Sequence, residues 1–189
     1  MVPARDTVTL LTPPTDKADA LYEFVDGEWK EVPRMGAFSS LLASRLAEEL
    51  NQFARAHNLG LAMAEVLFRL AVDGPARRPD VAFVAYERWP YTVPFDDDPP
   101  AFDIVPNLAV EVNSPSNTLD EIADKNRDYF FAGVEQVWVI QPRHRHVYIY
   151  DAPDKVYMLS DKQELDGGKI IPGFRLPLAT LFAAGTKPS

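Results

Sequence analysis

Residues 108–140 read LAVEVNSPSNTLDEIADKNRDYFFAGVEQVWVI. The first five residues are apolar except for Glu111, which is typical of a strand that is buried on both faces. Thr118 and Glu121 have the spacing of a capping box, so a helix is expected to begin there and to end near Gly133. The last seven residues are again strongly apolar and predict a second strand. The helix between two buried strands is typical of a crossover connection in a sheet.

Upstream of this unit, the sequence predicts a hairpin, a helix and two strands. Two alternating runs within residues 21–32 flank Asp26-Gly27, a pair that favours a tight turn. From Ala37 to about Asn58 the apolar residues recur at spacings of three and four, which predicts an amphipathic helix with Gly60 as its stop. The two strands are expected at residues 61–72 and 79–85.

The remaining segments complete a mixed fold. Residues 86–107 predict a long proline-rich loop, residues 147–150 a strand, and residues 178–182 a short terminal helix after a turn at Asp166-Gly167-Gly168. We therefore expect a mixed α/β (α+β) fold with a central mixed sheet flanked by helices and an N-terminal β-hairpin. Residues 1–20 are expected to form an arm, and residues 21–189 a single domain.

The composition is that of a globular protein. Of the 189 residues, 47% are hydrophobic and none is Cys, so disulfides, zinc–thiolate sites and thiol nucleophiles are excluded. The sequence has neither the apolar core of a signal peptide nor the roughly 20 consecutive apolar residues of a membrane helix. We expect a cytoplasmic protein with no membrane partner.

The negative charge is concentrated in one segment. The formal net charge is −9, and eight of the 28 acidic residues lie between Phe95 and Asp124 with no Lys or Arg among them. The rest of the chain is nearly neutral. An acidic balance argues against a nucleic-acid partner, but a concentrated acidic segment also attracts divalent cations. The alternative is a solvated acidic loop.

Two carboxylates are expected to converge in the sheet. Asp80 opens one predicted strand, Glu111 lies inside the next, and the order of elements makes these strands neighbours. A pair of carboxylates suits Mg²⁺, which binds oxygen ligands and can activate water for attack at phosphorus. Asp80 could equally be a turn residue after Pro79. Glu111 is harder to explain as structural, because an ionised side chain in a buried strand is costly unless it is paired.

Two further residues are candidates for the same site. Helical phase places Glu49 within the apolar arc of the first helix, where it either faces the site or pairs with Arg45 one turn earlier. Lys125 lies at the edge of the apolar stripe of the second helix and could hold a phosphate oxygen or orient the attacking water. The alternative for Lys125 is a solvated pair with Glu121.

Together, these residues resemble a known family. The segments that carry the resemblance are Tyr22-Glu-Phe-Val-Asp-Gly-Glu28, Arg78-Pro-Asp-Val81, Leu108-Ala-Val-Glu-Val-Asn-Ser-Pro-Ser116, Lys125, Tyr129, Gly133-Val134 and Trp138-Val-Ile-Gln-Pro142. They are similar to the Uma-type restriction endonucleases of the PD-(D/E)XK nuclease superfamily. The resemblance spans roughly residues 21–150, and the combined pattern is specific although each motif alone is weak.

The resemblance implies a restriction-endonuclease-like core that hydrolyses phosphodiester bonds of DNA. Asp80 and Glu111 would be ligands of Mg²⁺ or Mn²⁺, and Glu49 matches the acid often found on the first helix of the superfamily. The superfamily lysine usually follows its acid by two positions, but Asn113 stands there, so Lys125 would serve from the helix. A homodimer would suit the two-fold symmetry of many DNA-cleaving enzymes, although no residue indicates one.

The alternative is a catalytically inactive nuclease-fold module that binds nucleic acid or a protein partner. An enzyme requires the carboxylates and Lys125 around one cavity, whereas a binding module requires only a basic face. The distance between Lys125 and Glu111 separates the two hypotheses. A Lys125 that points to solvent more than about 10 Å from Glu111 would remove the basic member of the site.

Overall fold

The computed structural model of the chain describes residues 12–15, 17, 19–72, 74–89, 99–114, 118–183 and 185. Most of the predicted arm at residues 1–20 and the triple aspartate at residues 96–98 lie outside them. Among the residues that are described, no helix is long and apolar enough to span a membrane.

The described residues form twelve strands and three helices. The strands are β1 (Leu21–Val25), β2 (Glu28–Val32), β3 (Gly60–Ala64), β4 (Phe68–Arg69), β5 (Ala76–Arg77), β6 (Val81–Ala85), β7 (Leu108–Val112), β8 (Gln136–Gln141), β9 (His146–Ala152), β10 (Lys155–Ser160), β11 (Glu164–Asp166) and β12 (Arg175–Pro177). The helices are α1 (Ala37–His57), α2 (Leu119–Ala132) and α3 (Leu178–Phe182).

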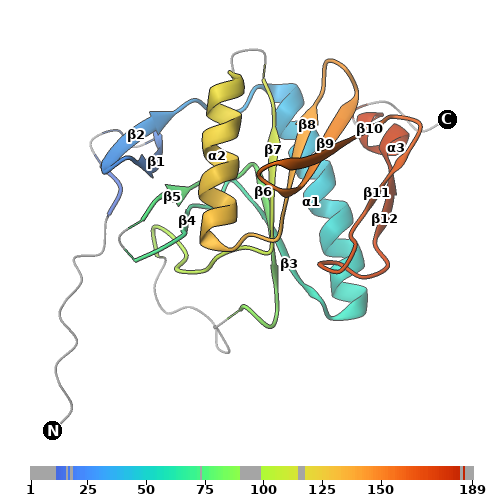
Figure 1. Cartoon of the computed structure of the whole chain (residues 1–189), viewed down its shortest axis with the longest axis horizontal. Coiled ribbons are helices and arrows are strands. Elements are labelled where there is room, and N and C mark those ends of the chain that lie inside the picture. Colours follow the sequence, from blue (N-terminus) through green and yellow to red (C-terminus); the bar gives the residue numbers. More distant parts are fainter. Residues whose placement is uncertain are drawn as a thin grey trace, which may run out of the picture.

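A six-stranded mixed sheet lies at the centre of the fold, with strand order β10-β9-β8-β7-β6-β3 (Figure 1). Within this sheet β7 and β8 pair in parallel, and the other neighbouring strands are antiparallel. Helix α2 connects the parallel pair, so the predicted crossover is confirmed. The expected mixed fold with a central sheet is confirmed as well.

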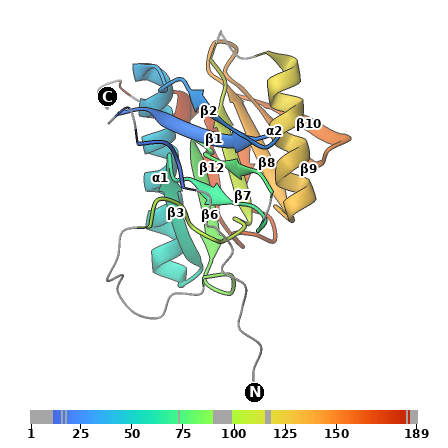
Figure 2. The same ribbon diagram turned by 90° about the vertical axis from the view of Figure 1, so that its left-hand side faces the viewer.

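Helices cover both faces of this sheet, because successive strand residues point to opposite sides and both sides are apolar. Leu42, Leu46 and Leu50 of α1 pack on one face together with α3. Tyr129 of α2 packs on the other face against Val137 and its neighbours. Figure 2 shows α1 and α2 on opposite sides of the strands.

Local sequence signals account for the helix ends. Thr118 and Glu121 form the predicted capping box, and Gly133 ends α2 in the left-handed conformation with φ 100°. The predicted stop of α1 at Gly60 is wrong, because Asn58 ends the helix with φ 54°. Gly60 instead opens β3, where a Cβ atom would lie 2.3 Å from the carbonyl oxygen of Val84.

The N-terminal hairpin is confirmed and belongs to a second sheet with order β2-β1-β5-β4. Asp26 and Gly27 have φ of 54° and 81°, as the tight turn of a two-residue hairpin requires. Phe24 of β1 pairs with Ala76 of β5, a strand that the sequence did not indicate. This pairing holds the hairpin beside the chain that leads into β6.

The prediction of one strand over residues 61–72 is wrong. The chain turns at Glu65, which has φ 53°, so β3 joins the large sheet and β4 joins the small one. Local alternation continues across this turn, and for that reason the pattern did not reveal it. The turn brings Glu65 beside the segment that carries Asp80, since the Glu65 N–H donates to the Asp80 carbonyl oxygen at 3.2 Å.

Candidate active site

The predicted convergence of Asp80 and Glu111 is observed. Val81 of β6 pairs with Val110 of β7 in an antiparallel register. This register places Asp80, the residue before β6, opposite Glu111. The carboxylate of Asp80 also accepts a hydrogen bond from the Val112 N–H at 2.5 Å. Strand pairing therefore holds both carboxylates at the same edge, and both line one cavity of about 600 Å³.

Glu111 is held by two residues of α2 that are one helical turn apart. The Lys125 ammonium donates to Oε2 at 2.9 Å, and the Tyr129 hydroxyl donates to Oε1 at 2.6 Å. Burial raises the pKa of Tyr129 well above its usual value, and the charge of Glu111 adds to this effect. Tyr129 therefore acts as a hydrogen-bond donor, and the Glu111 carboxylate is fixed by two donors.

Lys125 lies in the site and remains charged there. Its ammonium is also 3.2 Å from Oε1 of Glu23, and 22% of its side chain is exposed. Burial alone would lower the pKa of Lys125, but the charges of Glu111 and Glu23 outweigh burial and raise it. The alternative pair with Glu121 is not what the structure shows, because Glu121 caps α2 instead.

Glu23 is a buried acid of the site that the sequence reading missed. It lies on β1 and is only 2% exposed. It accepts hydrogen bonds from Nη1 of Arg77 at 2.8 Å and from the Arg78 backbone N–H at 3.0 Å. Burial raises the pKa of Glu23, but Lys125 and Arg77 outweigh it and lower that pKa. An acid between two apolar strand residues, Tyr22 and Phe24, was the available signal.

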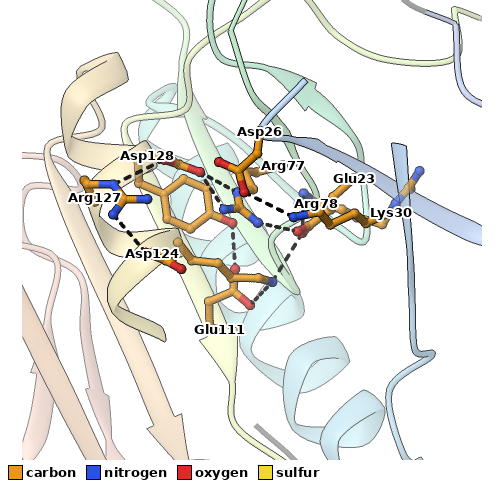
Figure 3. Close-up of polar contacts among 11 residues, drawn as sticks. Glu23, Asp26, Lys30, Arg77, Arg78, Glu111, Asp124, Arg127 and Asp128 are labelled. Atoms are coloured by element: carbon orange, nitrogen blue, oxygen red, sulfur yellow. Dashed lines mark hydrogen bonds and ion pairs between the residues drawn. The ribbon is translucent and has the colours of Figure 1, made fainter. Parts of the chain in front are cut away.

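Arg77 joins the hairpin to α2. Its guanidinium is buried and donates to Oδ2 of Asp128 through Nε at 2.9 Å and through Nη2 at 2.5 Å, in addition to its hydrogen bond with Glu23 (Figure 3). A buried cation with two carboxylate partners is strongly anchored. Arg77 therefore fixes the position of Glu23 and, through it, of Lys125.

Asp80 is the least compensated acid of this group. Burial and the nearby charge of Glu111 raise its pKa to about 7, although the Val112 N–H and Lys125 favour the charged form. A divalent cation between the two carboxylates would relieve this repulsion. Among the described residues no group of three or more His, Cys, Asp or Glu is arranged to hold a metal. Two carboxylates still fit Mg²⁺, which retains several waters as ligands.

The structure does not bring Glu49 to this cavity. Its carboxylate pairs with Arg45 at 2.8 Å, the alternative that the sequence left open. The residue of α1 that does line the cavity is Ser39, near the start of the helix. Glu49 lies ten residues later, about 15 Å farther along the helix axis. Helical phase indicated which side of α1 Glu49 occupies but not its distance from the site.

The cavity lies between the hairpin, the sheet and α2. Its floor is formed by the Asp80 and Glu111 segments, one wall by β1, β2 and the residues that follow β2, and the other wall by the first half of α2. Asn113, two residues after Glu111, also lines it. The acidic lining residues outnumber the basic ones, eight to five.

The fold is that of a restriction-endonuclease-like protein. A solved structure described as "a putative nuclease belonging to DUF820 from Anabaena variabilis" has the same fold, with a TM-score of 0.74 and 17% identity. The match covers 86% of this chain and 89% of that chain. The model of the Uma2 family, described as "Putative restriction endonuclease", matches residues 8–179, and the chain therefore belongs to that family. No curated protein matches the chain.

Proposed function

We propose that this protein is a metal-dependent endonuclease that hydrolyses phosphodiester bonds of DNA. The observation that supports the proposal is the placement of Asp80, Glu111 and Lys125 around one cavity, with Lys125 Nζ 2.9 Å from Glu111. Asp80 and Glu111 would hold Mg²⁺ or Mn²⁺. The cation would supply an activated water and neutralise charge that develops at phosphorus.

The other residues would orient the reactants. Lys125 is an ammonium at neutral pH, since its pKa is raised, so it acts as a hydrogen-bond donor and not as a base. Two carboxylates face it, Glu111 and Glu23, and an ammonium has a third N–H. That N–H can donate to the attacking water or to a non-bridging phosphate oxygen. Attack on phosphorus by the water, which gives up one proton to solvent, breaks the bond to one sugar oxygen, and this leaving group takes up a proton from solvent.

The charge of the cavity argues against the alternative of a metal-free module that binds nucleic acid. Eight acidic and five basic residues line it, so without a cation it repels phosphate. The net charge of −9 opposes binding of DNA. Membership of a restriction endonuclease family is the stronger argument, because it concerns the reaction itself.

Cleavage of a supercoiled plasmid in Mn²⁺ tests the proposal. We expect nicked and linear products from the wild type, and at least a 100-fold slower reaction from Lys125→Met, as is typical for loss of an electrostatic donor. Lys155→Met removes an exposed lysine that pairs with Asp151, outside the cavity, and should cleave like the wild type. Absence of cleavage by the wild type on plasmid and single-stranded DNA would refute the activity.

A further inference from the structure

One basic residue of the cavity differs from the other four in its partners. Among the described residues, Arg78 forms no ion pair, and its side chain makes a single hydrogen bond, from Nη1 to the Glu65 carbonyl oxygen. Its charge is therefore not neutralised by a contacting carboxylate. The four basic residues that do pair with carboxylates are Lys30, Arg34, Arg77 and Lys125.

Two residues that line the cavity carry unsatisfied polar atoms. Nε of Arg78 and Oδ1 of Asn113 are both buried without a hydrogen-bond partner among the described residues, and both residues line the cavity. Buried polar atoms are rarely left unpaired in folded proteins. Arg78 therefore has hydrogen-bonding capacity that the described residues leave unused, and it lines the cavity.

The side chain of Arg78 extends toward the β3 side of Asp80. Pro79 restricts the preceding residue to an extended conformation, and residues two apart in an extended chain point to the same side. Arg78 and Asp80 accordingly line the same cavity. Arg78 contacts Glu65, which follows β3, whereas Lys125 contacts Glu111 of β7, and β6 lies between these two strands.

We propose that Arg78 binds a phosphate of the substrate on the β3 side of the Asp80–Glu111 pair. The ligand class is a phosphate oxygen of a nucleic-acid strand, which a guanidinium can bind through two N–H groups. This inference rests on the proposed nuclease function and adds the residue that holds the strand. Lys125 would then contact the strand from α2, and Arg78 would contact it from the β3 side of Asp80.

Binding of a short fluorescein-labelled DNA duplex, and of the same single strand, tests the proposal by fluorescence anisotropy in Ca²⁺. We expect Arg78→Gln to weaken binding roughly 10- to 100-fold, the range for one charge-assisted hydrogen-bonding group. Arg78→Lys keeps the charge but not the planar fork and should give an intermediate loss. Arg55→Gln removes an equal charge from the exposed last turn of α1, outside the cavity, and should change the affinity less than about twofold.

Two outcomes separate this inference from the nuclease proposal. DNA binding that depends on Arg78 in a wild type that does not cleave DNA would support the phosphate site and refute the activity. Active cleavage with equal binding by Arg78→Gln and Arg55→Gln would overturn the phosphate site and leave the activity standing. Absence of DNA binding by the wild type in Ca²⁺ would also overturn it. Circular dichroism of each variant checks folding. If Arg78→Gln does not fold, the DNA affinity of Arg78→Lys is compared with that of Arg55→Gln instead.

Discussion

Glu23 and Glu111 contact the same ammonium group, that of Lys125, at 3.2 and 2.9 Å. Glu23 comes from the hairpin and Glu111 from the central sheet, so Lys125 of α2 joins two sheets and a helix at one point. An ammonium between two carboxylates stays protonated and keeps a fixed position. The same contacts that stabilise this part of the fold thus prepare the donor that the proposed reaction requires.

Removal of Lys125 should destabilise the protein as well as inactivate it. Lys125→Met leaves Glu23 and Glu111 buried with less compensation, and loss of one partner of a buried ion pair costs about 3 kcal/mol. Urea denaturation at neutral pH measures this change. Lys155→Met removes one partner of an exposed pair and should have little effect. Equal stability of both variants would show that the contacts of Lys125 are not maintained in solution.

Stability should depend on pH through Asp80. Its pKa in the folded protein, about 7, is above the ordinary value of 3.8, so the folded state binds the proton more tightly than the unfolded state. Stability is therefore lost as pH rises from about 4 through about 7, by up to about 4 kcal/mol in total at 1.4 kcal/mol per pKa unit.

Asp80→Asn cannot lose this proton and should show no such decline. In chelator, its advantage in unfolding free energy over the wild type should be about 2.5 kcal/mol larger at about pH 8 than at about pH 5. Urea denaturation at the two pH values gives the comparison. An advantage that is the same at both pH values would mean that Asp80 is not the titrating group.

The hydroxyl of Tyr129 should contribute to the stability of the protein through its hydrogen bond to Glu111. Tyr129→Phe retains the buried ring but removes the donor to Glu111, and loss of a hydrogen bond to a charged group costs about 1.5 kcal/mol. Chemical denaturation checks the value. Tyr148→Phe is the matched control, because no hydrogen bond of the Tyr148 hydroxyl joins it to the described residues. A loss no greater than that of the control would contradict the hydrogen bond.

Glu49 is expected to be dispensable for metal binding. Its carboxylate pairs with Arg45 outside the cavity, so Glu49→Ala should change the Mn²⁺ affinity less than about threefold. Calorimetric titration measures the affinity. A tenfold loss in this variant would restore the role that the family resemblance implied for the acid of the first helix.

Much of the fold could be predicted because its signals are local. The capping box of Thr118 and Glu121, the turn at Asp26-Gly27 and the apolar run around Glu111 each specify an element within a few residues. The same signals placed Asp80 and Glu111 on neighbouring strands. The turn at Glu65 was missed because an alternating pattern does not show which of two sheets a strand joins.

The rest of the site depends on tertiary packing. Glu23 reaches Lys125 because β1 pairs with β5, a strand too short to recognise in the sequence. Helical phase could place Glu49 on a face of α1, but the part of α1 that lies beside the cavity is set by how the helix packs on the sheet. These long-range relationships leave no mark in the spacing of residues.

Calorimetric titration of Mn²⁺ tests the proposed metal site of Asp80 and Glu111 without a nucleic-acid substrate. The proteins to compare are the wild type, Asp80→Asn and Glu111→Gln, with Glu49→Ala as the control. We predict binding by the wild type and the control, with an affinity at least about tenfold lower in Asp80→Asn and Glu111→Gln, because each loses a charged ligand. At pH 7 the heat of wild-type binding should also vary with the buffer, since the cation displaces the proton of Asp80. Absence of binding to the wild type, or equal affinity in all four proteins, would contradict the metal site and the proposed nuclease activity.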